Sequence, residues 1–435
     1  MSKQKLIPEL RFPEFENEGE WKETELESLG KFLGGGTPER SNIDYWIGSI
    51  PWVSSSDIKD DDIHNIYITR FINDMSIKNS ATKIIPKGSV LFVSRVGVGK
   101  LAINEEELCT SQDFTSFVPN KDVLNFFVGY YFSSNKNLLQ SLNQGTSIKG
   151  FSKNDLENFK LPYPDNTQEQ QKIASCLSSL DEVIAAHSQK LALLKDHKKG
   201  LMQNLFPQAG ENVPRYRFKE FEEDGEWVFE QFDKVYSFLV TNSFSRECLN
   251  YETGLVKNIH YGDIHTRFAT LFDLTNEKVP FINPDILIER IREECYCQEG
   301  DMVFADASED LNDVGKSIEI VNLNNEKLVS GLHTLMARQI ESKLAIGFGG
   351  YLFRSDRIRK QIQREAQGAK VLGISGTRIS NIEIFYPTNP KEQQKIASCL
   401  SSLDALITAQ AEQIAQLKLH KKGLMQGLFP KSIAN

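Results

Sequence analysis

The chain has 435 residues, which is too long for one ordinary core and fits two domains with their connections. Its 59 acidic and 50 basic residues give a net charge of −9, which excludes a protein that binds nucleic acid through bulk positive charge. The lack of a long apolar run or a hydrophobic signal segment, together with only six cysteines, predicts a cytoplasmic multidomain protein rather than a secreted, membrane or disordered one.

Two internal repeats give the domain organisation. Residues 169–207 and 392–430 are identical at 28 of 39 positions, and a shorter leader repeat occupies residues 8–21 and 214–227. A duplication explains both repeats. It divides the chain into a first domain with its leader (1–166), a first helix (167–207), a second domain with its leader (208–389) and a second helix (390–430).

Each variable block between a leader and a helix has the pattern of a small α/β domain with many loops. Residues 89–94 and 301–305 predict strands that each follow a glycine. The aromatic runs FFVGYYF at 126–132 and FGGYLF at 348–353 predict short helices. The two blocks share the spacing of these landmarks but little else, which suits a common frame that presents different surfaces.

The two long repeats predict coiled-coil helices. In both copies, apolar residues follow a 4-3 spacing that continues for more than four heptads. A helix of 38 residues spans ~57 Å, and its apolar stripe must be covered for it to be stable. We expect a capping box at each start, Asn166 with Glu169 and Asn389 with Glu392, with Pro390 at the first helical position of the second copy.

We expect the two helices to pair antiparallel within one chain. That arrangement places His187 opposite Lys421 and Lys198 opposite Gln410, so the polar seam positions share two layers and fix the register. A coiled coil between two chains is the alternative. The residues expected to pair the helices are Ile184, His187, Leu191, Leu194, Lys198, Ile407, Gln410, Ile414, Leu417 and Lys421. The predicted fold class is therefore α/β, with two globular domains joined and separated by two long helices in a pseudo-twofold repeat.

The usual catalytic signals are missing. Lys100, in the glycine loop at 97–100, is followed by Leu101 rather than by the Ser or Thr of a phosphate-binding loop, and the loop is too short for a dinucleotide site. Cys295 and Cys297 lack the second pair that a zinc site needs. We therefore expect no catalytic residue, metal or cofactor in this chain.

Local groups of basic and polar residues are candidates for contacts with phosphates and base edges. Glycine-rich loops in the first block, HYGDIHTRF at 260–268 and a basic helix at 354–364 carry them. The candidates are Ser94, Arg95, Lys100, Gln144, Thr146, Lys149, His260, His265, Arg267, Arg354, Arg357, Arg359, Lys360, Arg364, Lys370 and Arg378. Solvated loop histidines and a solvated charged helix are the alternatives.

Several segments together are characteristic of a known family. They are GGGTP at 34–38, YWIGSIPWVSSSDI at 45–58, GSVLFVSRVGVGKLAI at 88–103 and GTSIKGFSKNDLENFKLPYP at 145–164, then GDMVFADASED at 300–310 and QGAKVLGISGTRISNIEIFYP at 367–387. Both blocks run into EQQKIASCL. With this doubled module, the chain resembles the specificity (S) subunit of type I restriction–modification enzymes over almost its whole length. The second block departs from the pattern, because it lacks the GGGTP and IPW segments.

The resemblance implies two target-recognition domains that each read one half of a split, asymmetric DNA site. The helices would act as a spacer and as the docking surface for two modification (methyltransferase) subunits, which bring S-adenosylmethionine and methylate adenine. Restriction subunits would add ATP- and Mg²⁺-dependent translocation and cleavage, and this chain alone would be inactive. Two alternatives are the recognition part of a type II-like restriction–modification system and a two-headed coiled-coil scaffold that binds proteins.

Overall fold

The chain forms two compact units in the computed structural model, which describes residues 5–141 and 150–431. Unit 1 comprises Met1–Ser188 with Glu412–Asn435, and unit 2 comprises Gln189–Ala411. Each unit therefore contains one variable domain together with a segment of each long repeat. Among the described residues, no helix combines the length and the apolar character needed to cross a membrane. All six cysteines are free thiols.

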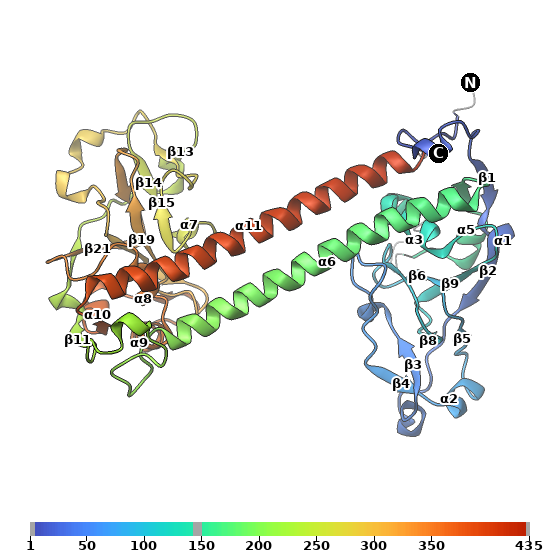
Figure 1. The fold of residues 1–435 in the computed structure, drawn as a ribbon, viewed down its shortest axis with the longest axis horizontal. Coiled ribbons are helices and arrows are strands. Elements are labelled where there is room, and N and C mark those ends of the chain that lie inside the picture. Colours follow the sequence, from blue (N-terminus) through green and yellow to red (C-terminus); the bar gives the residue numbers. More distant parts are fainter. Residues whose placement is uncertain (1–4, 142–149, 432–435) are drawn as a thin grey trace. The chain divides into compact units, whose positions relative to one another are not determined.

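The long repeats form the helices α6 (Thr167–Asn204) and α11 (Pro390–Leu428), as predicted. In unit 1, Asp181 of α6 pairs with Lys421 of α11, and the start of α6 and the end of α11 both contact the leader (Figure 1). Unit 2 contains the equivalent pair, with the end of α6 and the start of α11 at the second leader. The two helix segments in each unit therefore run antiparallel, which confirms antiparallel pairing within one chain. The predicted polar layers are wrong for the two lysines, since Lys421 pairs with Asp181 and Lys198 pairs with Asp404.

The start of each long helix differs in part from the predicted capping box. The side-chain oxygens of Asn166 and Asn389 each accept a backbone N–H two residues further on, so both asparagine caps are present. The carboxylates of Glu169 and Glu392 do not return to the cap, because each accepts two hydrogen bonds from an arginine of a leader. The reciprocal half of the predicted box is wrong, since a bidentate arginine is the stronger partner for a buried carboxylate.

Buried ion pairs tie each leader to its helix. Arg11 donates to both oxygens of Glu169 at 2.8 Å, and the indole N–H of Trp21 donates to the same carboxylate at 3.3 Å. Arg217 and Glu392 repeat the bidentate pair at 2.8 Å. Both glutamates are almost fully buried. Removing either arginine would leave an uncompensated buried charge, which makes these pairs strong constraints on the position of the leader.

Unit 1 contains two four-stranded sheets in its described residues. The first sheet is antiparallel, with the order β2 (Gly30–Gly34), β9 (Phe114–Pro119), β6 (Val90–Val93), β7 (Leu101–Ile103). The second is mixed, with the order β4 (Arg70–Ile72), β3 (Ile50–Val53), β8 (Leu108–Thr110), β5 (Ile84–Ile85). A further antiparallel pair, β1 (Lys22–Glu25) with β10 (Lys160–Tyr163), joins the leader to the segment before α6. The shorter helices are α1 (Leu26–Leu29), α2 (Asp74–Lys78), α3 (Asn125–Ser134), α4 (Lys136–Ser141) and α5 (Lys153–Glu157).

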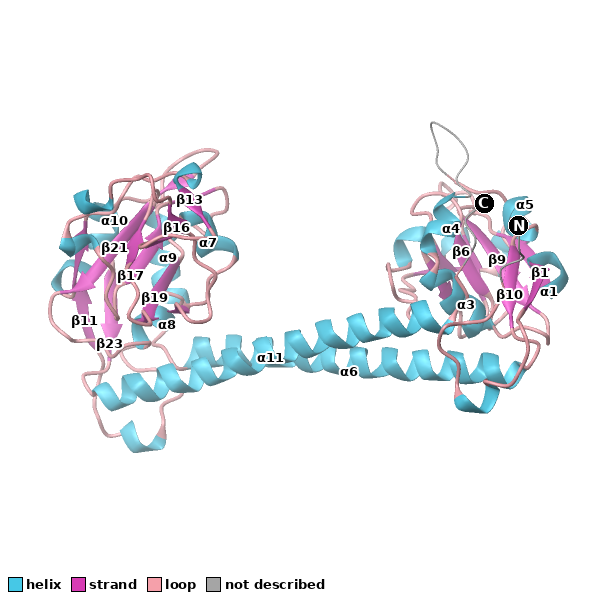
Figure 2. Ribbon diagram, turned by 90° about the horizontal axis from the view of Figure 1, so that it is seen from above, coloured by secondary structure: helices cyan, strands magenta, loops and turns pink. Residues whose placement is uncertain are grey.

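Unit 2 repeats this arrangement with additions (Figure 2). Its larger sheet has the order β12 (Tyr236–Leu239), β21 (Thr334–Gln339), β17 (Met302–Ala305), β19 (Ser317–Asn322), β15 (Leu271–Asp273). Its smaller sheet has the order β13 (Leu249–Asn250), β16 (Phe281–Ile282), β14 (Lys257–Ile259), β20 (Leu328–Ser330). Two antiparallel pairs complete it, β11 (Val228–Gln231) with β23 (Glu383–Tyr386) and β18 (Ala307–Ser308) with β22 (Leu372–Gly373). The shorter helices are α7 (Tyr261–Thr266), α8 (Phe348–Leu352), α9 (Asp356–Glu365) and α10 (Gly376–Ser380).

The predicted landmarks occupy matching places in the two units. The expected strands at 89–94 and 301–305 form as β6 and β17, which lie inside the antiparallel four-stranded sheet of unit 1 and the five-stranded sheet of unit 2. The expected aromatic helices form as α3 and α8, whose aromatic residues are mostly buried. The prediction of two α/β domains on a shared frame is confirmed.

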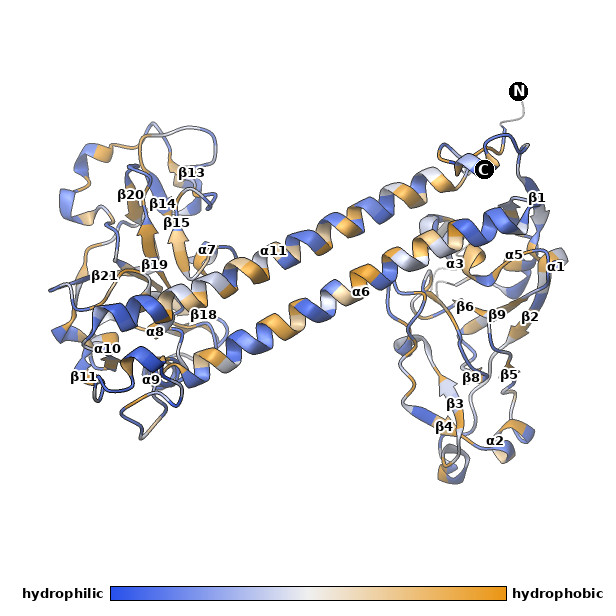
Figure 3. Ribbon diagram, viewed as in Figure 1, coloured by the Kyte–Doolittle hydropathy of each residue, from blue (hydrophilic) through white to orange (hydrophobic). Residues whose placement is uncertain are grey.

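An aromatic cluster closes the core of each unit at the leader. In unit 1, Trp21 packs against Phe127 of α3 and Phe429, with ring centroids 5.6 and 6.3 Å away. In unit 2, Trp227 packs in the same way against Phe348 and Phe206, at 6.0 and 6.1 Å. Each cluster includes a phenylalanine that lies just after the end of the long helix of the other repeat, Phe429 after α11 and Phe206 after α6. The hydrophobic stripe of α6 and α11 thus continues into the domain cores (Figure 3).

Unit 2 buries a carboxylate that has no cationic partner among the described residues. Glu319 of β19 is 1% exposed, and its oxygens accept the backbone N–H groups of Gly347 (2.8 Å) and Gly350 (2.6 Å). Burial raises the pKa of Glu319 to about 7. The folded chain therefore holds this proton to a higher pH than the unfolded chain does, and stability falls as the pH rises from about 4.5 to about 7.

We predict that Glu319→Gln, which cannot ionise, becomes more favourable for stability as the pH rises. The difference in unfolding free energy between the variant and the unchanged chain should increase by ~3 kcal/mol from pH 5 to pH 8. Chemical denaturation at the two pH values measures it. The exposed Glu309→Gln should show no such change, and a pH-independent difference for Glu319→Gln would contradict the assigned pKa.

Candidate functional site

The predicted contact residues of the first block lie in different environments. Ser94 is buried, and its hydroxyl donates to the carbonyl of Asp113 (3.0 Å). Lys100 donates to the carbonyl of Ile58 (3.2 Å), so both residues hold the fold together. Arg95 is exposed and makes no hydrogen bond or ion pair within the described residues. The other candidates of this block lie outside the described residues: Gln144, Thr146 and Lys149.

A buried aspartate, Asp57, organises the surface at the end of β3. Its carboxylate accepts the backbone N–H of Ser54 (2.7 Å) and pairs with Arg70 of β4, whose Nη2 also donates to the Ser54 hydroxyl (2.6 Å). Nη2 alone makes the hydrogen bonds of Arg70 in the described chain, so its Nη1 and Nε stay available. Asp57 therefore fixes the position of Arg70 and leaves two of its nitrogens, Nη1 and Nε, able to donate hydrogen bonds to a ligand.

An exposed tyrosine lies beside this aspartate. The backbone N–H of Tyr67 donates to the carbonyl of Asp57 (2.9 Å). The ammonium of Lys59 donates to the Tyr67 hydroxyl (3.0 Å) and lies 4.3 Å from the centre of its ring. Arg70 thus pairs with the carboxylate of Asp57, while Tyr67 and its partner Lys59 lie beside the backbone of the same residue.

Unit 2 contains the same anchor at Asp263 in α7. Both terminal nitrogens of Arg246 donate to its carboxylate (3.0 and 3.1 Å), and Nη1 also donates to the hydroxyl of Tyr251 (3.2 Å). Arg267 donates to the same hydroxyl (2.9 Å), and the ammonium of Lys278 lies 5.2 Å from the Tyr251 ring centre. Three cations therefore surround this exposed ring, a combination that suits phosphate contacts and stacking.

Three histidines gather around Tyr261 in the same part of unit 2. The ring centroids of His260, His333 and His265 lie 4.8, 5.3 and 6.3 Å from that of Tyr261. Nδ1 of His260 accepts the backbone N–H of Gly262 (3.1 Å), and the Arg246 guanidinium faces the same nitrogen (3.2 Å). Burial and the charge of Arg246 lower the pKa of His260, which agrees with a neutral ring in this position.

Sequence reasoning singled out His260, His265 and Arg267, which the structure brings together, but it missed the two aspartates and their arginines. A signal for them was present. Ser-Ser-Asp-Ile at 55–58 and Tyr-Gly-Asp-Ile at 261–264 lie 206 residues apart, which is the offset of the two leaders. Extending the leader alignment to this point would have identified both anchors.

The basic helix expected at 354–364 forms as α9 from Asp356, so Arg354 precedes it, and the arginines of this segment mostly bond within the domain. Arg359 donates to three backbone carbonyls, and burial lowers its pKa to about 10. Arg357 donates to two carbonyls and pairs with Glu383, and Arg354 donates to one. Arg378, outside this helix, bonds Glu365. The exposed candidates that remain on this side are Lys360, Arg364 and Lys370.

All ten predicted helix-pairing residues are buried or half-buried, whereas most of their neighbours along the helices are exposed. The two seam lysines bind aspartates that sequence reasoning did not single out. Lys421 pairs with Asp181, which also accepts from the hydroxyl of Tyr130 of α3 (2.7 Å). Lys198 pairs with Asp404, which accepts from Tyr351 of α8 (2.8 Å). The same three residue types thus join each domain to both long helices.

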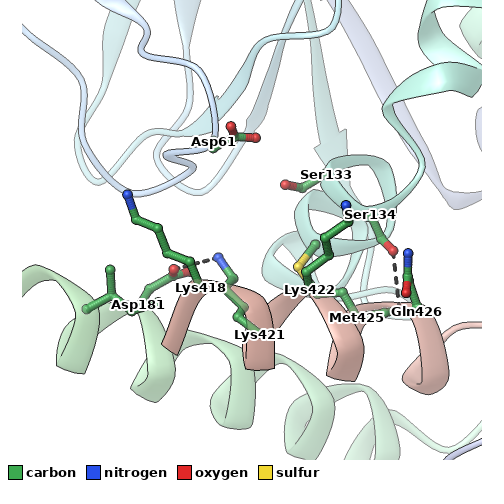
Figure 4. A pocket seen from close by; sticks show the side chains of 10 residues that line it. Asp61, Ser133, Ser134, Asp181, Lys418, Lys421, Lys422, Met425 and Gln426 are labelled. Atoms are coloured by element: carbon green, nitrogen blue, oxygen red, sulfur yellow. Dashed lines mark hydrogen bonds and ion pairs between the residues drawn. The ribbon is translucent and has the colours of Figure 1, made fainter. Parts of the chain in front are cut away.

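A cavity of about 430 Å³ lies beside the first of these junctions, between α3, α6 and α11 in unit 1 (Figure 4). Lys421 bonds Asp181 in its wall, whereas Lys418 and Lys422 make no ion pair within the described chain. His64 also reaches this junction, with Nε2 at 2.8 Å from the Tyr130 hydroxyl. The described residues contain no group of three or more His, Cys, Asp or Glu side chains arranged to hold a metal ion.

We predict that Lys421→Met lowers the unfolding free energy by ~2 kcal/mol, because it leaves the largely buried Asp181 without its lysine. The pKa of Asp181, which Lys421 and His64 hold below its ordinary value against the effect of burial, should rise. Denaturant titration measures the loss. Lys418→Met is the matched control on the same helix, and equal effects of the two variants would contradict the role of the pair.

Comparisons with known proteins agree with this architecture. The family model of the type I restriction modification DNA specificity domain matches residues 18–196 and 273–419. The type I restriction enzyme MjaIX specificity subunit of Methanocaldococcus jannaschii is 30% identical over 192 residues, which cover 43% of this chain and 44% of that protein. The MjaVIII specificity subunit of the same organism is 24% identical over 432 residues, which cover 98% of this chain and 94% of the relative.

The fold is also that of a solved structure. The type I restriction–modification system S subunit from M. genitalium superposes with a TM-score of 0.61 at 13% identity, covering 98% of this chain and 100% of that one. The alignment with the MjaIX subunit spans less than half of that relative, whereas the family model covers the first variable block, the second block from residue 273 onward and most of the long helices. The resemblance seen in the sequence is confirmed, and the chain belongs to the type I restriction–modification DNA specificity family.

Proposed function

We propose that this chain is the DNA-specificity subunit of a type I restriction–modification complex, in which each unit contacts one half of a bipartite, asymmetric site. The observation that carries the proposal is the shared frame with unlike surfaces. Asp57 and Asp263 occupy equivalent places and each fixes an arginine, yet the exposed residues beside them differ. Two different surfaces on one frame are what two unlike half-sites require.

The long helices support a second part of the proposal, the docking of two modification subunits. Val183 of α6 in unit 1 and Leu406 of α11 in unit 2 are equivalent positions of the repeat. Both are exposed, at 42% and 57%. Equivalent apolar positions on duplicated helices suit two copies of one partner.

In this proposal the chain performs no chemistry of its own. The modification subunits bind S-adenosylmethionine and methylate adenine in the site that this chain selects. Restriction subunits add translocation and cleavage that use ATP and Mg²⁺. The complex acts on double-stranded DNA in the cytoplasm.

We predict that exchanging residues 31–165 for the corresponding block of a relative changes only one half of the recognised site. The frame that holds the block is duplicated, so unit 2 keeps its own surface. Methylation mapping of cells that express the complete complex gives the readout. An exchange of residues 236–389 should change the other half, and a change in both halves, or in neither, would contradict the assignment.

We further predict that Val183→Glu and Leu406→Glu each weaken one docking site and that the double variant binds no modification subunit. A buried unpaired carboxylate opposes association. The mass of the assembled complex, measured by light scattering, counts the bound subunits. Leu193→Glu is the control, because this exposed residue is replaced by Gln416 in the other repeat. Full assembly of the double variant would exclude these positions as docking contacts.

A further inference from the structure

The two units present different side chains at one equivalent position. Ser54, Ser55 and Ser56 precede Asp57 in unit 1, and residues 260–262 (His-Tyr-Gly) precede the second anchor in unit 2. Each tripeptide directly follows a central strand of a mixed four-stranded sheet, β3 in unit 1 and β14 in unit 2. The strand before each tripeptide and the aspartate after it are therefore shared by the two units, whereas the side chains of the tripeptides differ.

The support behind each tripeptide is closely matched. The carbonyl of Val53 accepts the N–H of Ser111 (2.9 Å) in unit 1, and the carbonyl of Ile259 accepts the N–H of Gly331 (2.9 Å) in unit 2. A lysine then bonds a backbone carbonyl shortly after each aspartate. In unit 1 the ammonium of Lys100 donates to the carbonyl of Ile58 (3.2 Å), and in unit 2 that of Lys316 donates to the carbonyl of His265 (2.6 Å). Both segments are thus held at the strand end and beyond the aspartate, so the side chains between them can vary without loss of the fold.

The side chains offered to solvent carry different chemistry. In unit 1, Ser55 is half-buried and Ser56 is exposed, and hydroxyls can both donate to and accept from base edges. In unit 2, the hydroxyl of the half-buried Tyr261 makes no hydrogen bond within the described chain. The phenol of Tyr261 thus takes the place of a serine hydroxyl of unit 1, beside the largely buried imidazole of His260.

Cationic donors flank both tripeptides. Arg70 in unit 1 and Arg267 in unit 2 each use one terminal nitrogen for hydrogen bonds inside the domain, which leaves further donors directed by a fixed side chain. Their exposure, 35% and 41%, makes these donors accessible. Phosphate contacts from such residues set the register of a protein on DNA, and neighbouring side chains then reach base edges.

We propose that residues 54–56 and 260–262 are specificity-determining positions, each reading bases of one half-site while Arg70 and Arg267 bind adjacent phosphates. This inference rests on the proposed function. It assigns base recognition to two short segments of the variable blocks and the register on the DNA to the anchored arginines.

The test uses the complex reconstituted with its modification subunits and a library of duplexes randomised across the recognised site. Sequencing the bound duplexes gives the preference at every base pair. The double variant Ser55→Ala with Ser56→Ala should lower the preference about tenfold at positions of one half-site only. Tyr261→Phe, which removes only a hydroxyl, should lower the base preference at positions of the other half-site.

A second pair of variants separates base reading from phosphate binding. Gly262→Ser introduces a hydroxyl where a Cβ meets its nearest neighbours at ordinary contact distance, 3.4 Å, so it should alter the preference without disturbing the fold. Arg267→Gln should weaken binding to all sequences alike and reduce the slope of log affinity against log salt by about one.

The control is Lys234→Ala, an exposed residue between β11 and β12 whose ammonium makes no bond in the described chain, which should leave both half-sites and the salt slope unchanged. Unaltered preferences in the serine, tyrosine and glycine variants would overturn the inference while leaving the proposed function intact. If the complex with the unsubstituted chain shows no preference for a bipartite DNA sequence, that result would instead overturn the proposed function.

Discussion

The buried pairs Arg11–Glu169 and Arg217–Glu392 are the constraint on which the rest of each unit depends. A carboxylate this deeply buried is tolerated only with a partner that satisfies both oxygens, and a bidentate arginine does so. Because the arginine belongs to a leader and the glutamate to the first turn of a long helix, each pair fixes where the domain begins and where its helix starts. The β1–β10 and β11–β23 pairs and the two tryptophan clusters then assemble around these points.

The contacts that hold each domain to its leader and its helices are the same in both copies of the duplication, whereas surface residues differ between the copies. The leader pairs, the tryptophan clusters and the Tyr–Asp–Lys junctions recur in both units with nearly the same geometry. Differences occur even inside the frame, where the position below the aromatic helix is Ile103 in unit 1 and the buried Glu319 in unit 2. Differences also lie at the strand ends beside Asp57 and Asp263, where Ser54, Ser55 and Ser56 correspond to residues 260–262. A protein that must recognise two unlike sequences with one architecture needs this division between fixed support and variable surface.

Sequence reasoning recovered what local periodicity determines. The long helices, the strands β6 and β17 and the aromatic helices follow from spacing along the chain, so they were predictable. Partners distant in sequence were not, since nothing in the first turn of α6 indicates that Glu169 turns away from its cap to Arg11. The same holds for Asp181, whose lysine lies on the other repeat.

The roles of the side chains on α9 could be predicted only in part from the sequence. In α9, Ile358 and Ile362 are buried, and the helical period places Lys360 and Arg364 on the opposite side, where they are exposed. That division was readable from the sequence. The roles of Arg357 and Arg359 were not, because their partners are backbone carbonyls supplied by loops distant along the chain.

The central claim is that one duplicated frame carries two independent DNA-reading surfaces. Sequencing of methylated bases in the genome of cells that express this chain with its modification subunits tests it most directly. The account predicts one asymmetric motif made of two unlike parts, separated by a gap of fixed length and unspecified sequence, with a methylated adenine in each part. A continuous or palindromic motif, or the absence of any motif that depends on this chain, would contradict it.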